Sequence, residues 1–304
     1  MQLIFNNLSL KKLLFLAVSA NFARPLHPEG YFLINCMIHP HTYIHPNARL
    51  ATNVKIDPFT VIHQDVEIGD GTWIGSNVTI MEGARIGKNC RIFPGAVIAA
   101  IPQDLKFHGE YSQVIIGDNT TIREFVTVNR GTADREKTVI GKNCLIMAYS
   151  HFAHDCLVGD NVIVSNNTQV AGHVTIGEWS ILAGMCAVHQ FVKIGAHSFV
   201  AGGSLVSKDV PPYIKAGRTP LSYAGVNSIG LKRRGFSIER INHILDIYRV
   251  LYNKGMNTSQ AVEYIEEEMP ATDERDEIVT FIRESGRGII KRFTKGNNDD
   301  DLPV

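Results

Sequence analysis

The sequence predicts a solenoid of short β-strands followed by a small α-helical part. Three observations predict it: an apolar residue that recurs every six positions, small or β-branched residues at a second fixed phase, and a change to helical spacing after Val206. The chain has 304 residues, 44% of them hydrophobic, which is enough to bury a substantial core. Its 30 basic and 30 acidic residues balance, so no net positive charge favours binding to a polyanion.

The six-residue repeat runs from Ile38 to Val206. Of its 29 positions, 26 hold an apolar branched or aromatic residue, and the exceptions are Asp104, Glu110 and Asp134. A helix repeats near 3.6 residues and a single strand at 2, so a period of six with Gly, Asn and Asp in between indicates short strands joined by tight turns. The segments IGDGTW, IGSNVT, IGKNCR and IGDNTT show the pattern most plainly.

Residues 1 to 36 precede the repeat and need a separate interpretation. Lys11 and Lys12 followed by LLFLAVSA imitate a short secretory signal. Because the repeat begins abruptly at Met37, we favour a disordered extension or an upstream start codon. The apolar run at residues 13 to 20 is about half of the roughly 20 residues that a membrane-spanning helix needs.

Four of the five cysteines fall on the phase of the repeat that otherwise holds small or β-branched residues. There a compact thiol fills a tight corner of the coil; these residues are Cys90, Cys144, Cys156 and Cys186. Cys36 lies outside the repeat and the chain has no CxxC motif. The cysteines therefore support neither a disulfide framework nor a zinc site, and they favour a reducing compartment.

Two polar insertions interrupt the repeat, near residues 99–115 and 129–138 within a predicted coil at 37–210. The first, AAIPQDLKFHGEYSQV, is about one coil long and offers an amide, a carboxylate and an ammonium from Gln103, Asp104 and Lys106. Long ordered loops on repeat proteins often carry function, so we interpret it as a substrate loop, with a solvated insertion as the alternative. The second, NRGTADREK, carries the same two alternatives with less weight on function.

The part after the repeat is predicted to be an α-helical domain at 211–295, ending in a loose tail at 296–304. Apolar residues recur at helical spacing from Ser237 to Gly255. A second helix is expected from Ser259 to Met269, before Pro270, and a third from Asp273 to Ser285. These helices would cover the open end of the coil, whose strand edges are otherwise unpaired.

If one coil takes three of the six-residue units, or hexads, then positions three hexads apart lie above one another at the spacing of paired strands. This places His154 under Gly172 and Asp155 under His173, with Gln190 next in the column. An imidazole beside a carboxylate can accept a proton from a hydroxyl, and a glycine N–H can hold an oxyanion, which suits acyl transfer. There are two alternatives: the histidines only form hydrogen bonds on a solvent-exposed face of the coil, or they bind zinc.

The hexads, SHFAHDC, AGHV, AGMCAVHQF and GVNSIGLKRRGFS together resemble the UDP-N-acetylglucosamine O-acyltransferases, from Met37 to about Arg292. The resemblance implies an all-β left-handed parallel β-helix with three hexads per coil, followed by a small α-helical C-terminal domain. It also implies a cytoplasmic homotrimer that transfers a 3-hydroxyacyl chain from acyl carrier protein to the 3-hydroxyl of UDP-N-acetylglucosamine. In that family this transfer is the first committed step of lipid A biosynthesis.

Carried onto this sequence, the resemblance implies His154 as general base, Asp155 as its support and the Gly172 amide as oxyanion donor. Gly202 matches the position that limits acyl length. Substrate contacts are implied for Gln103, Asp104, Lys106, His151, His173, His189, Gln190, Asn227 and Arg233.

The chain departs from the family pattern at Ile229, where a glutamate is usual, and at Asn129, where a histidine is common. The basic run Lys232–Arg234 is a candidate docking surface for the acidic carrier protein, or simply a solvated face. Since a thioester is already activated, the reaction requires no metal or other cofactor. Two alternatives remain open: a hexapeptide transferase that uses coenzyme A, for example on a sugar amine, and a non-catalytic binding solenoid.

Overall fold

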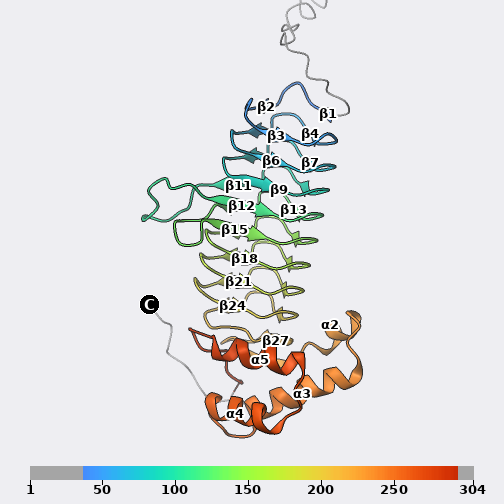
Figure 1. Cartoon of the computed structure of the whole chain (residues 1–304), viewed down its shortest axis with the longest axis vertical. Helices are drawn as coiled ribbons and strands as arrows, with labels where there is room; N and C mark the ends of the chain where they lie inside the picture. The colour runs from blue at the N-terminus through green and yellow to red at the C-terminus, as the bar shows by residue number, and fades with distance from the viewer. Residues whose placement is uncertain (1–36, 294–304) are drawn as a thin grey trace, which may run out of the picture. The chain divides into compact units, whose positions relative to one another are not determined.

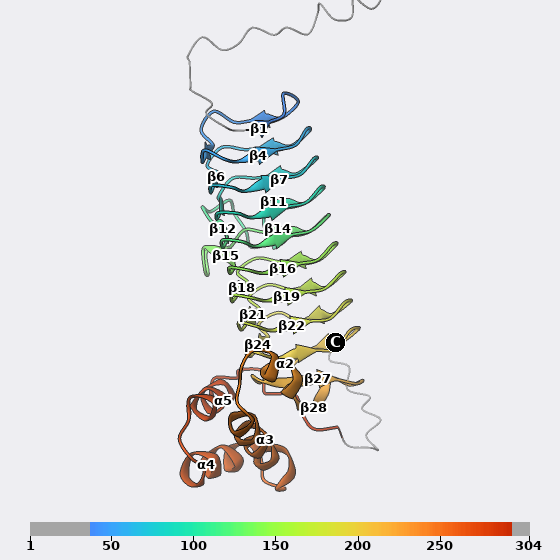
Figure 2. The same cartoon turned by 90° about the vertical axis from the view of Figure 1, so that its right-hand side faces the viewer.

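The structure is a computed structural model that describes residues 37–293. The predictions for residues 1 to 36, including Cys36, and for the tail at 296–304 lie outside the described residues. Within the described range the chain winds through 28 short strands and then four helices, α2 to α5. Figures 1 and 2 show the strands stacked coil upon coil, with the helices following the last coil.

The strands form three sheets, each of which is one face of the coil. The eleven-stranded sheet of the described residues is, in spatial order, β1 (Met37–Ile38), β4 (Lys55–Ile56), β7 (Trp73–Ile74), β10 (Arg91–Ile92), β13 (Thr121–Ile122), β16 (Leu145–Ile146), β19 (Ile163–Val164), β22 (Ile181–Leu182), β25 (Phe199–Val200), β27 (Ile214–Gly217) and β28 (Ser222–Val226).

The second sheet has nine strands in the described range: β2 (Tyr43–Ile44), β5 (Val61–Ile62), β8 (Thr79–Ile80), β11 (Val97–Ala100), β14 (Thr127–Asn129), β17 (His151–Phe152), β20 (Gln169–Val170), β23 (Ala187–Val188) and β26 (Leu205–Val206). The third, of eight described strands, is β24 (Lys193–Ile194), β21 (Thr175–Ile176), β18 (Leu157–Val158), β15 (Lys137–Ile140), β12 (Gln113–Ile116), β9 (Ala84–Ile86), β6 (Glu67–Ile68) and β3 (Arg49–Leu50).

The six-residue positions line the inside of the coil. From Ile56 onward each apolar residue at that phase is buried, and the pairing of like with like, as in Ile74 with Ile92, repeats from rung to rung. From β1 to β26, parallel partners lie three hexads apart along the sequence wherever no insertion intervenes, as for His151 with Gln169. The predicted period and coil length are therefore those of the structure.

The small side chains of the second phase link neighbouring coils. The Thr60 and Ser180 hydroxyls donate to carbonyl oxygens of the next coil, at 2.7 and 2.8 Å. The four described thiols occupy equivalent places, and Cys156 Sγ, for example, donates to Ala171 O at 3.2 Å. Burial raises the pKa of Cys144 to about 11, so this thiol stays protonated and unreactive at neutral pH.

The glycine of each IG pair permits the coils to approach closely. A Cβ added at Gly117 would lie 2.7 Å from the carbonyl carbon of Gly141 in the next coil, and one at Gly69 would lie 2.6 Å from that of Gly87. A larger residue at these positions would push the coils apart.

The part after Val206 contains three elements that the periodicity did not indicate, two strands and a short helix. Sheet pairing continues past Val206, because β27 adds in parallel to β25 and β28 turns back antiparallel beside β27. A short helix, α2 (Ser228–Arg233), then precedes the three predicted ones, α3 (Ile238–Asn253), α4 (Thr258–Glu268) and α5 (Asp273–Arg283). Among the helices of residues 37–293, none is long and apolar enough to cross a bilayer.

The helices are anchored to the end of the coil through buried aromatic and polar groups. Tyr248 of α3 is fully buried and its hydroxyl donates to Pro212 O at 2.6 Å. His197 lies between the rings of Trp179 and Tyr213, with centroids 6.4 and 5.5 Å away, and only 9% of it is exposed. The neighbouring Asn227 amide donates to His197 O at 2.9 Å.

This buried imidazole is expected to make the fold sensitive to acid. Burial, assisted by Arg234 and Arg240, lowers the pKa of His197 from 6.5 to about 4. Between pH 6.5 and 4 this histidine is protonated in the unfolded chain but neutral in the folded chain. The free energy of unfolding is therefore expected to fall by about 2–3 kcal/mol as the pH drops through this range. His197→Phe keeps a ring in the stack and is expected to flatten this slope, measured by urea unfolding at a series of pH values. An unchanged slope would contradict the assignment.

Candidate active site

Both insertions leave the coil at the same corner, the turn from the nine-stranded into the eight-stranded sheet. We call it the insertion corner; it comprises residues 101–112, 130–136, 153–156, 171–174 and 189–192. Figure 1 shows the two loops projecting from one side of the coil, the first between β11 and β12 and the second leading into β15. The predicted histidine cluster lies in the next turns at this corner.

His154 and Asp155 occupy the turn between β17 and β18. Asp155 is completely buried and has a φ of 60°, a left-handed conformation that aspartate tolerates better than most residues. Its side chain thereby turns back toward the histidine ring, and His154 Nδ1 lies 2.8 Å from Asp155 Oδ2. His154 itself is 7% exposed.

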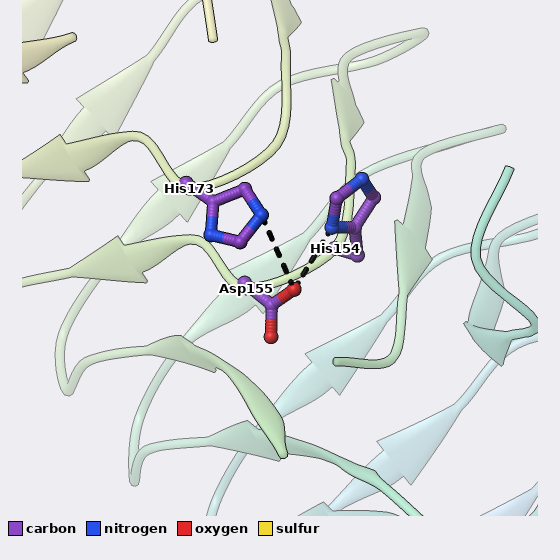
Figure 3. A group of neighbouring side chains, drawn as sticks. All are labelled: His154, Asp155 and His173. Carbon is purple, nitrogen blue, oxygen red and sulfur yellow. Dashed lines mark hydrogen bonds and ion pairs between the residues drawn. The ribbon is translucent and has the colours of Figure 1, made fainter. Parts of the chain in front are cut away.

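The next coil contributes Gly172 and His173, which lie above His154 and Asp155 as the spacing of three hexads predicts. The His173 amide donates to His154 O at 3.0 Å, and the two rings meet edge to face with centroids 5.0 Å apart. His173 Nε2 lies 3.7 Å from Asp155 Oδ2, so this carboxylate oxygen lies between both imidazoles, as Figure 3 shows. On its far side His173 stacks on Phe191, centroid to centroid at 4.6 Å.

Gly172 leaves room for the histidine ring. A Cβ at this position would lie 2.6 Å from Cε1 and 2.8 Å from Nε2 of His154. Among the backbone hydrogen bonds of residues 37–293, none is donated by the Gly172 amide. The N–H thus has no backbone acceptor among the described residues and is available to a negatively charged oxygen.

Asp155 is held by the second insertion. The Thr132 hydroxyl donates to Asp155 Oδ2 at 2.6 Å, and the Thr132 and Arg135 amides donate to Oδ1 at 3.0 and 3.3 Å. Burial alone would raise the pKa of Asp155, but hydrogen bonds from Thr132 and His154 hold that pKa below its usual value. An ionised carboxylate only accepts, so the proton of a neutral His154 must be on Nδ1, and Nε2 keeps its lone pair.

The bare Nε2 of His154 faces the first insertion. It lies 3.8 Å from Asp104 Oδ2, the one predicted loop residue that contacts the histidine cluster in the described chain. Asp104 Oδ1 accepts the Lys106 amide at 2.9 Å, which shapes the loop, while the side chains of Gln103 and Lys106 are exposed.

Among the described residues, the other substrate residues predicted for the coil are not in contact with this cluster. His151 is on the outer face of β17, where its Nδ1 lies 2.7 Å from Thr127 Oγ1, and burial lowers its pKa. His189 and Gln190 lie one coil beyond Gly172 at the insertion corner, and His189 Nδ1 lies 3.0 Å from Gln190 O. Gly202 is at another corner, between β25 and β26, where a Cβ would lie 3.1 Å from Gly184 O.

Within one chain the structure does not bring Asn227 and Arg233 to the insertion corner. Asn227 is buried against His197, at the corner between the eight-stranded and eleven-stranded sheets, and Arg233 is exposed on α2 nearby. Of the two departures from the family pattern, Ile229 is 70% exposed on α2. Asn129 is buried at the start of the second insertion, and its amide donates to Ile101 O at 3.1 Å.

Three residues of this site were missed by the sequence reasoning: Thr132, Asp134 and Phe191. Asp134 Oδ2 lies 3.2 Å from His173 Nδ1, without hydrogen-bond geometry. The sequence held a signal for two of them. Asp134 is one of the three polar residues at the six-residue positions, and Phe191 lies three hexads after His173. The signal for Thr132 was the insertion itself, which lengthens that coil from three hexads to four, since Thr127 pairs with His151.

The donor set favours proton transfer over metal binding. His154, Asp155 and His173 are the one group within residues 37–293 whose ligand atoms lie close enough together, within 4.8 Å, to hold a metal ion. However, the Asp155 oxygens already accept from Thr132, Arg135 and His154, so their lone pairs are in use. A metal would have to displace these bonds.

Comparisons with known proteins agree with this architecture. Residues 209–290 match the model of UDP-N-acetylglucosamine O-acyltransferase, domain 2, and residues 65–100 and 137–172 match the bacterial transferase hexapeptide model. The acyl-[acyl-carrier-protein]–UDP-N-acetylglucosamine O-acyltransferases of Herminiimonas arsenicoxydans and Xylella fastidiosa are 43% and 45% identical. Each match covers 64% of this chain, and 77% and 75% of the two relatives.

Solved structures give the same result. The UDP-N-acetylglucosamine acyltransferase of Bacteroides fragilis is 51% identical with a TM-score of 0.83, covering 84% of this chain and 100% of that one. The Francisella novicida enzyme is 42% identical with a TM-score of 0.82, covering 84% and 94%. These matches confirm the predicted fold class, a left-handed parallel β-helix with a small helical C-terminal part. The chain is an acyltransferase and belongs to the UDP-N-acetylglucosamine O-acyltransferase family.

Proposed function

We propose that this chain transfers a 3-hydroxyacyl group from acyl carrier protein to the 3-hydroxyl of UDP-N-acetylglucosamine, as the first step of lipid A biosynthesis. The observation that carries the proposal is the 2.8 Å hydrogen bond between His154 Nδ1 and the buried, ionised Asp155. It leaves Nε2 as a base next to Gly172, whose amide donates no backbone hydrogen bond among the described residues. The relatives whose names include this donor and acceptor support the choice of substrates.

In the proposed reaction, His154 Nε2 accepts the proton of the sugar hydroxyl while its oxygen attacks the thioester carbonyl carbon. The new C–O bond pushes the carbonyl electrons onto oxygen, and the Gly172 N–H stabilises this oxyanion. Collapse of the intermediate breaks the C–S bond, and the imidazolium returns the proton to the leaving carrier thiolate. Asp155 stabilises the imidazolium between the two transfers.

We assign substrate binding to residues around the base. Gln103, Asp104 and Lys106 would contact the substrates from the first insertion, and His151, His173, His189 and Gln190 would contact the nucleotide sugar. Gly202 would leave room for a long acyl chain. Asn227 lies at a different corner of the coil and Arg233 on α2 nearby, which supports a homotrimer in which a neighbouring copy brings them to the nucleotide. A cytoplasmic location and carrier docking at Lys232–Arg234 are parts of the same proposal.

The test supplies the purified chain with 3-hydroxyacyl carrier protein or the matching coenzyme A thioester, and with UDP-N-acetylglucosamine or its 3-amino analogue. We expect an ester of UDP-N-acetylglucosamine, formed from the carrier protein at least about 100-fold faster than from coenzyme A. An amide made from coenzyme A would favour the alternative transferase. Binding of the nucleotide sugar without turnover across several acyl lengths would favour a binding solenoid. Light scattering on the same sample reads the oligomeric state.

Gly172→Ala is expected to lower kcat about 10- to 100-fold while the protein stays folded. The added methyl would collide with Cε1 and Nε2 of His154, so the ring must leave the position that Asp155 gives it. Turnover and thermal unfolding are compared with Gly286→Ala, where a Cβ would meet no atom of the described residues within 4 Å. Activity of Gly172→Ala equal to that of this control would show that the close fit of ring and glycine is unimportant.

A further inference from the structure

The second insertion, residues 130–136, supplies most of the hydrogen bonds that hold Asp155. Thr132 alone gives two donors: its hydroxyl lies 2.6 Å from Oδ2, and its amide lies 3.0 Å from Oδ1 and 3.2 Å from Oδ2. The Arg135 amide adds a third at 3.3 Å from Oδ1. Because Asp155 is completely buried, water cannot replace any of these donors if one is removed.

The insertion is itself fixed to the coil. The Arg135 guanidinium donates to Asp155 O at 2.8 Å, and the Glu136 amide closes the loop on Thr132 O at 2.8 Å. Ala133 N donates to Glu110 Oε1 at 3.2 Å, which joins this loop to the first insertion. Thr132 is therefore in place before any substrate arrives.

A short chain of contacts runs from Thr132 to the reacting nitrogen. The Thr132 hydroxyl and His154 Nδ1 meet the same oxygen, Asp155 Oδ2, at 2.6 and 2.8 Å. Two donors on one oxygen fix the direction of the carboxylate and share its charge. The hydroxyl thus influences both where the His154 ring points and how strongly the ring retains its proton.

We propose that Thr132 is a positioning residue for His154: through Asp155 Oδ2 its hydroxyl fixes the orientation and the Nδ1-protonated form of the imidazole. The inference rests on the proposed function of His154 as the base. Thr132 acts through Asp155, so its loss alters the acid–base step and leaves substrate affinity unchanged.

Other titratable groups lie around the same imidazole and must stay constant in a test. Asp104 of the first insertion lies 3.8 Å from His154 Nε2, and His173 of the next coil meets the ring edge to face. Asp134 faces His173, and burial lowers the pKa of His173. A substitution of Thr132 leaves all of these groups unchanged. A change in the pH profile of the Thr132 variant therefore reports the Thr132–Asp155–His154 contacts.

The test compares Thr132→Val, which keeps the size and the backbone N–H, with Thr132→Ser, which also keeps a hydroxyl. Thr132→Val is expected to lower kcat about tenfold, with KM for the sugar nucleotide within about twofold of the unchanged chain. One donor fewer leaves more negative charge on Asp155 for the imidazolium. The acid limb of kcat/KM is therefore expected to move up by about 0.5–1 pH unit. Thr132→Ser is expected to restore both values.

The matched control is Thr138→Val on β15. Thr138 is completely buried, yet its hydroxyl has no hydrogen-bond partner among the described residues, so its loss is expected to leave kcat and the pH profile unchanged. Thermal unfolding verifies that each variant is folded, and Thr132→Ala takes the place of Thr132→Val if the latter is not. An unshifted acid limb, or a Thr132→Ser variant as impaired as Thr132→Val, would overturn the proposal.

A measurement without substrate separates this inference from the proposed function. Nitrogen NMR of the histidine rings in the full chain is expected to show His154 protonated at Nδ1, and a changed protonation equilibrium in Thr132→Val only. No transfer by the unchanged chain would overturn the proposed function, whereas an NMR signature indifferent to Thr132 would overturn the positioning role alone.

Discussion

Replacing His154 with alanine is expected to lower turnover by about 10²–10⁴-fold, the range that a general base contributes. The ring carries a nitrogen lone pair next to Gly172, where a Cβ would lie 2.8 Å from His154 Nε2. Without it the sugar hydroxyl must lose its proton to water, which is a much weaker base. Binding of the sugar nucleotide is expected to persist, because the proposed contacts from the other side chains remain.

The fold is expected to survive this substitution. His154 is in a turn outside the apolar column, and the packing of Phe152 and Cys156 on either side does not depend on its ring. His243→Ala provides the control, since this histidine belongs to α3 and its Nε2 is buried without a hydrogen-bond partner among residues 37–293. Turnover within about twofold of the unchanged chain for His154→Ala, with intact folding in both variants, would remove His154 from the mechanism.

Asp155→Asn is expected to impair turnover almost as severely, again by about 10²–10⁴-fold. The hydrogen-bond donors around the side chain determine the orientation of the asparagine amide. Oδ1 accepts from the backbone N–H groups of Thr132 and Arg135, and an amide nitrogen there would face two donors. The oxygen of the asparagine therefore stays at Oδ1, and its NH₂ takes the place of Oδ2, opposite His154 Nδ1.

In this arrangement the asparagine donates to Nδ1, so the imidazole proton moves to Nε2 and the base is lost. The backbone is expected to tolerate the change, because asparagine adopts the left-handed conformation at φ 60° as readily as aspartate. The measurement is kcat/KM against pH, with thermal unfolding as the test of the fold. A variant that keeps more than about a third of the original rate would show that the tautomer of His154 is not set by this residue.

The coil and its histidine column were predictable because a β-helix repeats regularly. A residue and its neighbour one coil later are separated by a constant three hexads, and the pairing of His151 with Gln169 obeys that spacing. Sequence arithmetic therefore placed Asp155 beneath His173 and His154 beneath Gly172, and the hydrogen bond from His173 N to His154 O agrees.

The arithmetic fails where the coil length changes. Val97 pairs with Thr127 and Thr127 with His151, separations of five and four hexads, so a constant step of three hexads passes over the insertions. The spacing rule therefore does not identify Thr132, although its hydroxyl donates a hydrogen bond to Asp155 Oδ2. Elements without periodicity were missed for another reason: α2 has six residues, too few for a helical pattern, and β28 pairs antiparallel. Asn227 was assigned by family resemblance, which gives no position within a single chain.

The most direct test of the account is a side-by-side assay of the unchanged chain and His154→Ala with 3-hydroxyacyl carrier protein and UDP-N-acetylglucosamine. Both proteins are first shown to be folded, and the product is identified by mass spectrometry with the linkage located by NMR. We expect the unchanged chain alone to form an ester at the 3-hydroxyl of the sugar. Equal product from both proteins, or no ester from the unchanged chain at any acyl length, would contradict the account.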